Sequence, residues 1–306
     1  MRFARAKNIS GIDSCSKDGS MQTGERSILR AKFDSRPASG TPLPVINGLW
    51  IGQLSPLEQL CIKSFVVQGH PYHLYTYGEL EGVPSGVTLQ DASQILPQSL
   101  VFRNQLGKGK GSVAAFSDLF RYKLLLERGG WWVDTDVFCL KPFDFAAPYV
   151  FGAEDKPVAS GVIKMPKGCD LAQRCYDLAR QVDPKTIVWN ELVAILERGV
   201  RDLKLMKYVL PPETFSPIPW NEIPNHILGR KTFRPSMRSF GVHLYNEMWR
   251  RNHLDKWRRY PSSSALNVLR RYSGIPEESG VDEEPASILM RPAMAIARYF
   301  SGKRAA

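Results

Sequence analysis

Two aspartates stand close together directly after a run of apolar residues. Asp134 and Asp136 follow Trp131-Trp132-Val133, within a stretch that predicts a strand over residues 131–140. Side chains two positions apart on a strand share a face, so we expect both carboxylates to point the same way where the chain leaves the sheet. Carboxylate oxygens suit Mg²⁺ or Mn²⁺, and such an ion can neutralise a diphosphate leaving group. An isolated pair of this kind is more often a solvated turn, so its surroundings decide its meaning.

The segment before this strand carries a second charged pair. Residues 112–128 have apolar side chains at helical spacing and predict a helix. Asp118 and Arg121 are three positions apart, so they share one face of that helix. A carboxylate beside a guanidinium can hold sugar hydroxyls by charge-assisted hydrogen bonds, although such a pair alone is more often a surface ion pair worth little.

Two glycines and two tryptophans connect the helix to the strand. Gly129 and Gly130 predict the end of the helix and allow the backbone to turn tightly and approach a ligand. Trp131 and Trp132 offer flat surfaces for a ring. Together with the acidic pair and the Asp118–Arg121 pair described above, these residues favour a binding site over a chance arrangement.

The elements that must position these residues are those of an α/β domain. Residues 44–52 predict a buried strand, and Ser55-Pro56-Leu57-Glu58 begins a helix with a cap, a proline and an acidic residue at the expected places. A second strand is predicted over residues 72–77 and a weaker strand with a turn over residues 87–96. This β-α-β order predicts a mostly parallel sheet flanked by helices.

The chain divides into three parts by composition. Residues 1–40 are rich in Ser, Gly and charge and are interpreted as a disordered basic extension. Residues 41–260 form the α/β domain, with further helices predicted around residues 169–181 and 189–199. Residues 261–306 form a basic tail whose last apolar stretch, interrupted by Pro292, is interpreted as a membrane-surface helix.

The central segment resembles a known family. Ser117 to Asp136 follows the pattern S-D-x-x-R-Y-x-x-L-x-x-x-G-G-x-[YW]-x-D-x-D. This pattern is similar to the sugar-binding region, with its DXD motif, of glycosyltransferase family 32, which includes bacterial capsular and polysaccharide enzymes and initiating mannosyltransferases. The clostridial glucosylating toxins share the same core. The resemblance covers about residues 42–255.

The resemblance implies a GT-A type nucleotide-diphospho-sugar-binding domain. It implies that a hexose moves from a UDP- or GDP-linked donor to a glycan or lipid-linked acceptor, with Mn²⁺ or Mg²⁺ and with retention of configuration. It also implies that Asp118 and Arg121 hold donor hydroxyls, that Asp134 contacts the ribose and metal-bound water, and that Asp136 binds the ion. Trp50 is expected near the base.

Further residues are carried over from the resemblance. Gly130 and Trp132 are expected to line the donor, although the family usually has Tyr at the position of Trp132. His243 and Asn246 are similar to a terminal H-x-x-[NGS] element that completes the metal shell; taken alone, such a pair is more often core or loop packing. Glu154-Asp155 either faces the acceptor or forms a solvated turn, and we favour the turn.

Charge and cysteine content restrict the partners and the compartment. The chain has 41 Lys and Arg against 30 Asp and Glu, a formal charge of +11, and much of the excess lies within residues 1–40 and 247–306. Basic ends favour a peripheral contact with an anionic membrane. The five cysteines form no CxxC pair, and no apolar segment follows the first basic residues, so we expect a cytoplasmic protein, peripheral at the inner face of a membrane.

Two other functions compete with the transferase. A haloacid-dehalogenase-like phosphatase also uses D-x-D after a strand, but Asp134-Thr135-Asp136-Val137-Phe138 lacks a Thr or Ser two places after the second acid. A basic nucleic-acid-binding protein would explain the charge, but no zinc spacing or aromatic RNA-binding motif is present. We therefore expect no nucleic-acid partner.

Overall fold

The computed structural model describes residues 42–188 and 191–276. The expected extension over residues 1–40 and the tail from residue 277 onward lie outside the described residues. The strands are β1 (Ile46–Leu49), β2 (Tyr72–Thr76), β3 (Val87–Asp91), β4 (Gly130–Val133), β5 (Val137–Cys139), β6 (Val150–Gly152), β7 (Val162–Met165), β8 (Val209–Leu210) and β9 (Gly241–His243). The α-helices are α2 (Pro56–Val67), α3 (Ala114–Arg128), α4 (Asp170–Ala179), α5 (Glu191–Asp202), α6 (Ile223–Ile227), α7 (Asn246–Arg251) and α8 (Ala265–Tyr272).

A seven-stranded sheet in the order β3-β2-β1-β4-β7-β6-β8 forms the centre of the fold. Strands β3, β2, β1 and β4 are parallel, β7 is antiparallel to both β4 and β6, and β8 is parallel to β6. Strands β5 and β9 form a small second sheet. The mostly parallel central sheet with flanking helices confirms the expected α/β architecture.

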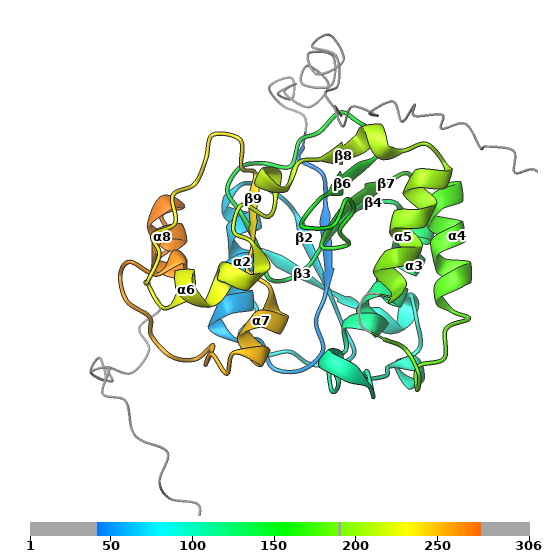
Figure 1. The fold of residues 1–306 in the computed structure, drawn as a ribbon, viewed down its shortest axis with the longest axis horizontal. Helices are drawn as coiled ribbons and strands as arrows, with labels where there is room; N and C mark the ends of the chain where they lie inside the picture. The colour runs from blue at the N-terminus through cyan, green and yellow to red at the C-terminus, as the bar shows by residue number, and fades with distance from the viewer. Residues whose placement is uncertain (1–41, 189–190, 277–306) are drawn as a thin grey trace, which may run out of the picture.

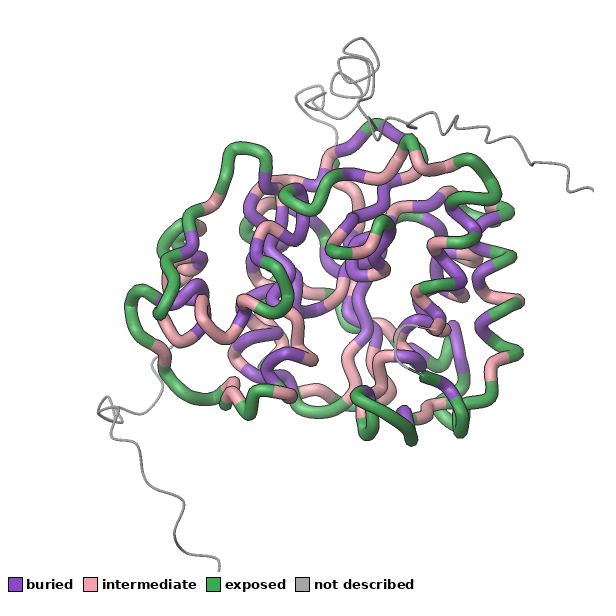
Figure 2. Tube along the Cα trace, viewed as in Figure 1, coloured by how far each residue is buried: buried purple, intermediate pink, exposed green. Residues whose placement is uncertain are grey.

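Helices cover both faces of the sheet, as Figure 1 shows, with α3, α4 and α5 on one side and α2 with the C-terminal helices on the other. Alternate residues of β4 face the two sides: Trp132 packs in the cluster beneath α3, whereas Trp131 and Val133 pack in the cluster on the opposite face. Figure 2 shows that burial is concentrated in the sheet and the inner faces of the helices.

Helix α2 begins where the sequence predicted. Ser55 caps it, and the Glu58 carboxylate accepts a hydrogen bond of 2.9 Å from the Ser55 N–H, which forms the expected capping box. The cap fixes where the chain turns after β1.

Because β1, β2 and β4 are parallel, their carboxyl ends meet at one edge of the sheet, and the order reverses between β1 and β4. Ligands of open α/β sheets bind at such an edge.

The packed part of the chain continues past residue 260, where the sequence predicted the tail to begin. Helix α8 buries Ala265, Leu266 and Leu269 in the same apolar cluster as Trp249 of α7. An amphipathic helix with a buried face is part of the core, and a basic composition alone did not reveal that face. Across the described residues, no helix combines the length and apolar character that crossing a bilayer requires.

Candidate metal and donor site

Asp134 and Asp136 lie in the turn that connects β4 to β5. Asp134 N–H donates to the carbonyl of Gly161 over 2.8 Å, and Val137 N–H donates to the carbonyl of Asp134 over 3.0 Å. The single strand predicted over residues 131–140 is therefore wrong. The turn redirects the chain so that β5 pairs with β9 in another sheet, and this long-range pairing overrides the local strand pattern.

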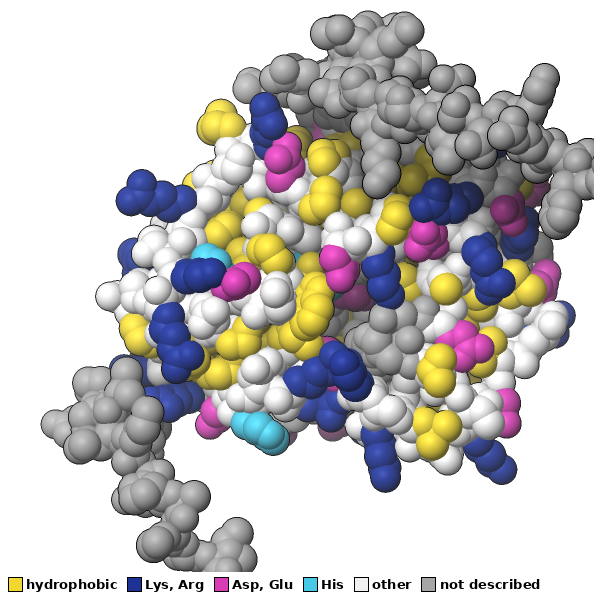
Figure 3. All heavy atoms as spheres, in the orientation of Figure 1, with side chains coloured by type: hydrophobic (Ala, Val, Ile, Leu, Met, Phe, Trp, Pro, Cys, Tyr) yellow, Lys and Arg dark blue, Asp and Glu magenta, His cyan; other side chains and the backbone are white. Residues whose placement is uncertain are grey.

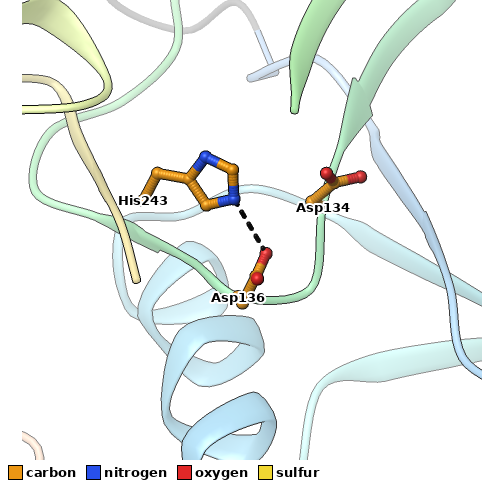
Figure 4. Close-up of side chains that lie close together, drawn as sticks. All are labelled: Asp134, Asp136 and His243. Atoms are coloured by element: carbon orange, nitrogen blue, oxygen red, sulfur yellow. Dashed lines mark ion pairs between the residues drawn. The ribbon is translucent and has the colours of Figure 1, made fainter. Parts of the chain in front are cut away.

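The pairing of β5 with β9 brings His243 to the acidic pair. Val137 lies opposite His243 in the register, so the imidazole stands beside the turn. His243 Nε2 is 3.3 Å from Asp136 Oδ1. One ligand atom from each of Asp134, Asp136 and His243 lies within 4.8 Å of the others, and Figure 4 shows the three side chains converging from the turn and from β9.

Asn246, at the start of α7, contacts the acidic pair through its backbone. Its N–H donates to Asp136 Oδ2 over 2.6 Å. Its side-chain Oδ1 is buried and has no hydrogen-bond partner. A buried carbonyl oxygen without a partner costs free energy, so this atom lacks the compensation that buried polar groups usually have.

The three titratable groups differ in charge state. Burial raises the pKa of Asp134 to about 6, against the lowering influence of the Arg121 guanidinium. Burial also acts to raise the pKa of Asp136, but the charge of His243 and hydrogen bonds from His243 and Asn246 outweigh it and lower that pKa to about 2. Burial favours neutral His243, yet Asp136 and Glu154 raise its pKa well above the ordinary value. The site thus holds protons that a cation must displace.

Asp118 and Arg121 lie beneath the turn, on α3. Arg121 Nη2 is 3.1 Å from Asp134 Oδ1, and Nη1 donates to the carbonyl of Ser160. Arg121 Nε donates to the Ser117 carbonyl over 3.3 Å and lies 3.3 Å from Asp118 Oδ1. Every nitrogen of this guanidinium has a partner within the protein. Asp118 Oδ1 is buried and accepts no hydrogen bond in the structure, and Arg121 Nε is its ion-pair partner.

Trp132 is not open to a ligand ring. Its exposed fraction is 1%, and Trp131 is fully buried, so neither indole is a flat wall of the kind expected from the sequence. The Trp132 Nε1–H donates to Asp134 Oδ1 over 2.8 Å, and the Arg121 guanidinium lies over its ring at 4.9 Å. Because helices cover both faces of the sheet, both indoles face the core. Trp132 therefore holds Asp134 in place through its N–H.

Gly130 lies at the amino end of β4, opposite Met165, whereas the aspartates follow the carboxyl end of the same strand. This placement separates it from the acids by the length of the strand. Gly129 and Gly130 have positive φ angles of 67° and 83° and serve the turn from helix to strand. Gly129 allows the backbone of Lys167, and not a ligand, to pass close by. A Cβ at Gly129 would lie 2.4 Å from the Lys167 nitrogen.

Trp50 follows β1 at the carboxyl edge of the sheet. Its Nε1 is buried without a hydrogen-bond partner, and the Lys256 Nζ lies 5.6 Å from its ring centroid. Lys256 also forms a 2.6 Å ion pair with Glu58 and acts to lower the pKa of Asp136. The sequence did not single out Lys256. Its contacts with Glu58 and Trp50 identify it, and both residues are far from it in the sequence, so no local pattern predicts them.

Glu154 and Tyr245 complete the surroundings of His243. Glu154 Oε1 is 3.0 Å from His243 Nδ1, so this residue is not the solvated turn that the sequence favoured. The Tyr245 ring stacks on the imidazole at a centroid distance of 3.9 Å, with Tyr245 in the left-handed region at φ 49°. Gly161 leaves room for this arrangement, because a Cβ there would lie 3.0 Å from His243 Cε1.

A family model described as a glycosyltransferase sugar-binding region containing a DXD motif matches residues 62–154. The match includes Asp118, Arg121, Asp134 and Asp136. The chain therefore carries a sugar-binding region of the DXD glycosyltransferase type.

Known proteins similar to this chain are distant. Subversion of eukaryotic traffic protein A of Legionella pneumophila (strain Philadelphia 1) is 22% identical over 176 residues, which are 49% of this chain and 27% of the relative. The chain thus spans about a quarter of that protein. PaToxG glycosyltransferase has a TM-score of 0.33 at 15% identity, covering 60% of this chain and 82% of that structure. The apo form of the glycosyltransferase GlyE of Streptococcus pneumoniae TIGR4 has a TM-score of 0.43 at 13% identity, covering 76% of this chain and 60% of that structure.

Proposed function

We propose that this glycosyltransferase moves a hexose from a UDP- or GDP-linked donor to a hydroxyl of a glycan or lipid-linked acceptor, with a divalent cation. The observation that carries the proposal is the convergence of Asp134, Asp136 and His243 at the carboxyl edge of the sheet. This edge is where α/β folds bind nucleotides, and the two acids belong to the matched sugar-binding region.

The residues at this edge fit a divalent cation. Two carboxylates, an imidazole and the unpartnered Asn246 Oδ1 form a donor set of oxygens and one nitrogen, which suits Mn²⁺ or Mg²⁺. When bound, the ion supplies charge neutralisation for the departing diphosphate. The hydrogen bond from Asn246 N–H and the contact with His243 hold the Asp136 carboxylate in one orientation before any ligand arrives.

The other residues receive distinct roles in the proposal. Asp118 accepts a donor sugar hydroxyl through its Oδ1, which pairs with Arg121 Nε but accepts no hydrogen bond within the protein. Arg121 and Trp132 act as positioning residues, because both bind Asp134 Oδ1 from within the protein. Trp50 lies beside the base, where its free Nε1–H can donate to a carbonyl of the nucleobase.

The reaction exchanges one bond at the anomeric carbon for another. The acceptor oxygen forms a bond to this carbon while the bond to the donor phosphate oxygen breaks, and the electron pair leaves with the diphosphate. The hydroxyl proton passes to the departing phosphate oxygen. We propose retention of configuration, with attack and departure on the same face of the sugar. Lys256, near Trp50 and Asp136, adds positive charge on the donor side.

The proposal includes placement in glycosyltransferase family 32, with a main domain that begins at about residue 41 and continues through α8, and a site of action at the inner face of a membrane. The phosphatase alternative is not favoured, because the matched region is a sugar-binding one. For the nucleic-acid alternative, Figure 3 shows Lys and Arg spread around the visible face and interspersed with acids, without a continuous basic stripe on that face.

A donor screen tests the proposal. Purified protein is incubated with UDP-glucose, UDP-galactose, UDP-N-acetylglucosamine and GDP-mannose, with and without Mn²⁺, and nucleoside diphosphate release is measured. We expect hydrolysis of at least one donor, at least about tenfold faster with Mn²⁺. Hydrolysis of p-nitrophenyl phosphate without cleavage of any sugar nucleotide would support the phosphatase instead.

A further inference from the structure

A cavity of about 440 Å³ lies next to the cation site and has no role in donor binding as described above. Its size is within the range of small-molecule pockets. Its walls come from the segments after β6 and β8 and from the turn before α7. The lining residues that matter here are Glu154, Asp155, Ser216, Pro219, Trp220 and Tyr245.

This cavity shares a wall with the cation site. Glu154 lines the cavity and also contacts His243 Nδ1 at 3.0 Å, and Tyr245 lines it while stacking on the same imidazole. A molecule held there is therefore next to the imidazole of the cation site.

The cavity and the expected base site lie on opposite sides of the acids. Trp50 follows β1, on one side of β4, whereas Glu154 follows β6, which is separated from β4 on the other side by β7. A nucleotide beside Trp50 leaves this cavity open to a second substrate.

The side chains of the cavity combine a flat apolar surface with fixed hydrogen-bond acceptors. Trp220 is 40% exposed, and its Nε1–H donates to Asp155 Oδ2 over 2.9 Å, which holds the indole in place. Each carboxylate has further lone pairs beyond its internal contact, so Asp155 and Glu154 can still accept from hydroxyls. A pyranose ring presents both an apolar face and hydroxyl donors, which match this surface.

A cationic peptide side chain matches the cavity less well. Glu154 already pairs with His243, and Asp155 already accepts from Trp220. Glu154 is thus partly neutralised, and Asp155 is exposed, so the attraction of Asp155 for an ammonium is screened by solvent and worth little. A neutral polyhydroxylated ring requires no additional charge pairing.

We propose that this cavity is the acceptor subsite and that it binds a pyranose ring, stacked on Trp220 with its hydroxyls on Asp155 and Glu154. The acceptor is then a glycoside, whether free or carried on a lipid. This inference rests on the proposed transferase function, because it names the second substrate of that reaction.

Binding of simple glycosides without donor tests the subsite separately from catalysis. The probes are the methyl α- and β-pyranosides of glucose, galactose, mannose and N-acetylglucosamine, observed by saturation-transfer NMR and titration. We expect at least one to bind the full chain and Trp220→Ala to weaken it at least about tenfold. Trp220→Phe, which keeps a flat ring, should lose less. Tyr272→Ala removes another exposed aromatic residue, on α8, and should change nothing.

Donor hydrolysis measured on the same variants distinguishes this inference from the proposed function. Tyr272→Ala, at a residue that lies in neither site, should hydrolyse the donor within about twofold of the wild type and is the reference for Trp220→Ala. Binding of no glycoside, unchanged binding in Trp220→Ala, or a Lys-rich peptide that binds through Trp220 would each overturn the acceptor assignment. A wild type that binds glycosides but cleaves no sugar nucleotide would overturn the transferase function while leaving a sugar-binding pocket.

Discussion

His243 Nε2 lies 3.3 Å from Asp136 Oδ1, a contact made by the register of β5 against β9. On the other side of the ring, Nδ1 contacts Glu154, so the imidazole is held at both nitrogens. A ligand imidazole oriented by a carboxylate is a common feature of metal sites, because the second contact fixes the ring and raises its basicity. The same contacts keep Asp136 ionised although it is buried.

Cation affinity should rise with pH. Asp134, with a pKa of about 6, and His243, with a pKa raised well above its ordinary value, both carry protons at pH 5.5, and each proton must leave before a cation binds. We expect Mn²⁺ affinity to increase at least about tenfold from pH 5.5 to 7.5, with proton release detected by titration calorimetry in buffers of different ionisation enthalpy. Affinity that is constant across this range, with no proton release, would contradict the arrangement.

Asp136→Asn should abolish most turnover while preserving the fold. The amide oxygen can still accept from Asn246 N–H, but the charge that faces the cation and His243 is lost. We expect donor hydrolysis to fall at least about 100-fold, with little change in the denaturation midpoint relative to the wild type.

Asp202→Asn is the matched control for this change, since Asp202 is half-exposed and pairs with Arg174 on the surface. It should leave donor hydrolysis within about twofold of the wild type. Full activity in Asp136→Asn would sink the assignment of this carboxylate to the cation.

Arg121→Lys keeps the positive charge but should still disturb the site. A lysine has its donors on one nitrogen and cannot reproduce the contacts that the three guanidinium nitrogens make with Asp118, Asp134 and the Ser117 and Ser160 carbonyls. Buried acceptors therefore lose partners. We expect the free energy of unfolding to decrease by about 1–3 kcal/mol and donor turnover to fall more than about tenfold at a temperature where the variant is folded. Urea denaturation and steady-state kinetics measure the two effects.

The control for this substitution is Arg174→Lys, in an exposed pair with Asp202. Its effect on unfolding should stay below about 0.5 kcal/mol. If Arg121→Lys were as harmless as the control, the guanidinium would not be what positions Asp134.

Gly129→Ala should destabilise the protein more than Gly168→Ala. Both glycines have φ near +67°, but Gly129 has ψ −165° and a Cβ there would meet the Lys167 backbone at 2.4 Å, whereas a Cβ at Gly168 meets nothing within 4 Å. We expect a loss of about 1 kcal/mol at Gly168 and about 3 kcal/mol or more at Gly129. Equal losses, measured by chemical denaturation, would show that the close approach of Lys167 adds nothing.

Local patterns predicted the parallel strands of the sheet and the two charged pairs that lie beside them. The capping box of α2, helix α3 and strands β1 to β3 follow from spacing and cap residues, with boundaries shifted by a few positions. Asp118 and Arg121 lie within one short segment with the two acids, so their proximity required only a helix, a turn and a strand. The continuous strand over residues 131–140 was wrong because β5 joins another sheet through a distant partner.

The sequence alone determined that two carboxylates follow a buried strand and that the helix before this strand carries a charged pair. Helix and strand periodicities depend on a few neighbouring residues, so they can be recognised locally. Only the tertiary structure decided that Glu154 and Lys256 reach this place, that Trp132 faces inward, and that Gly130 lies at the far end of β4. Those placements depend on strand register and on packing between segments far apart in the chain, and no local pattern of charge or hydrophobicity encodes which distant side chain will fill a given position.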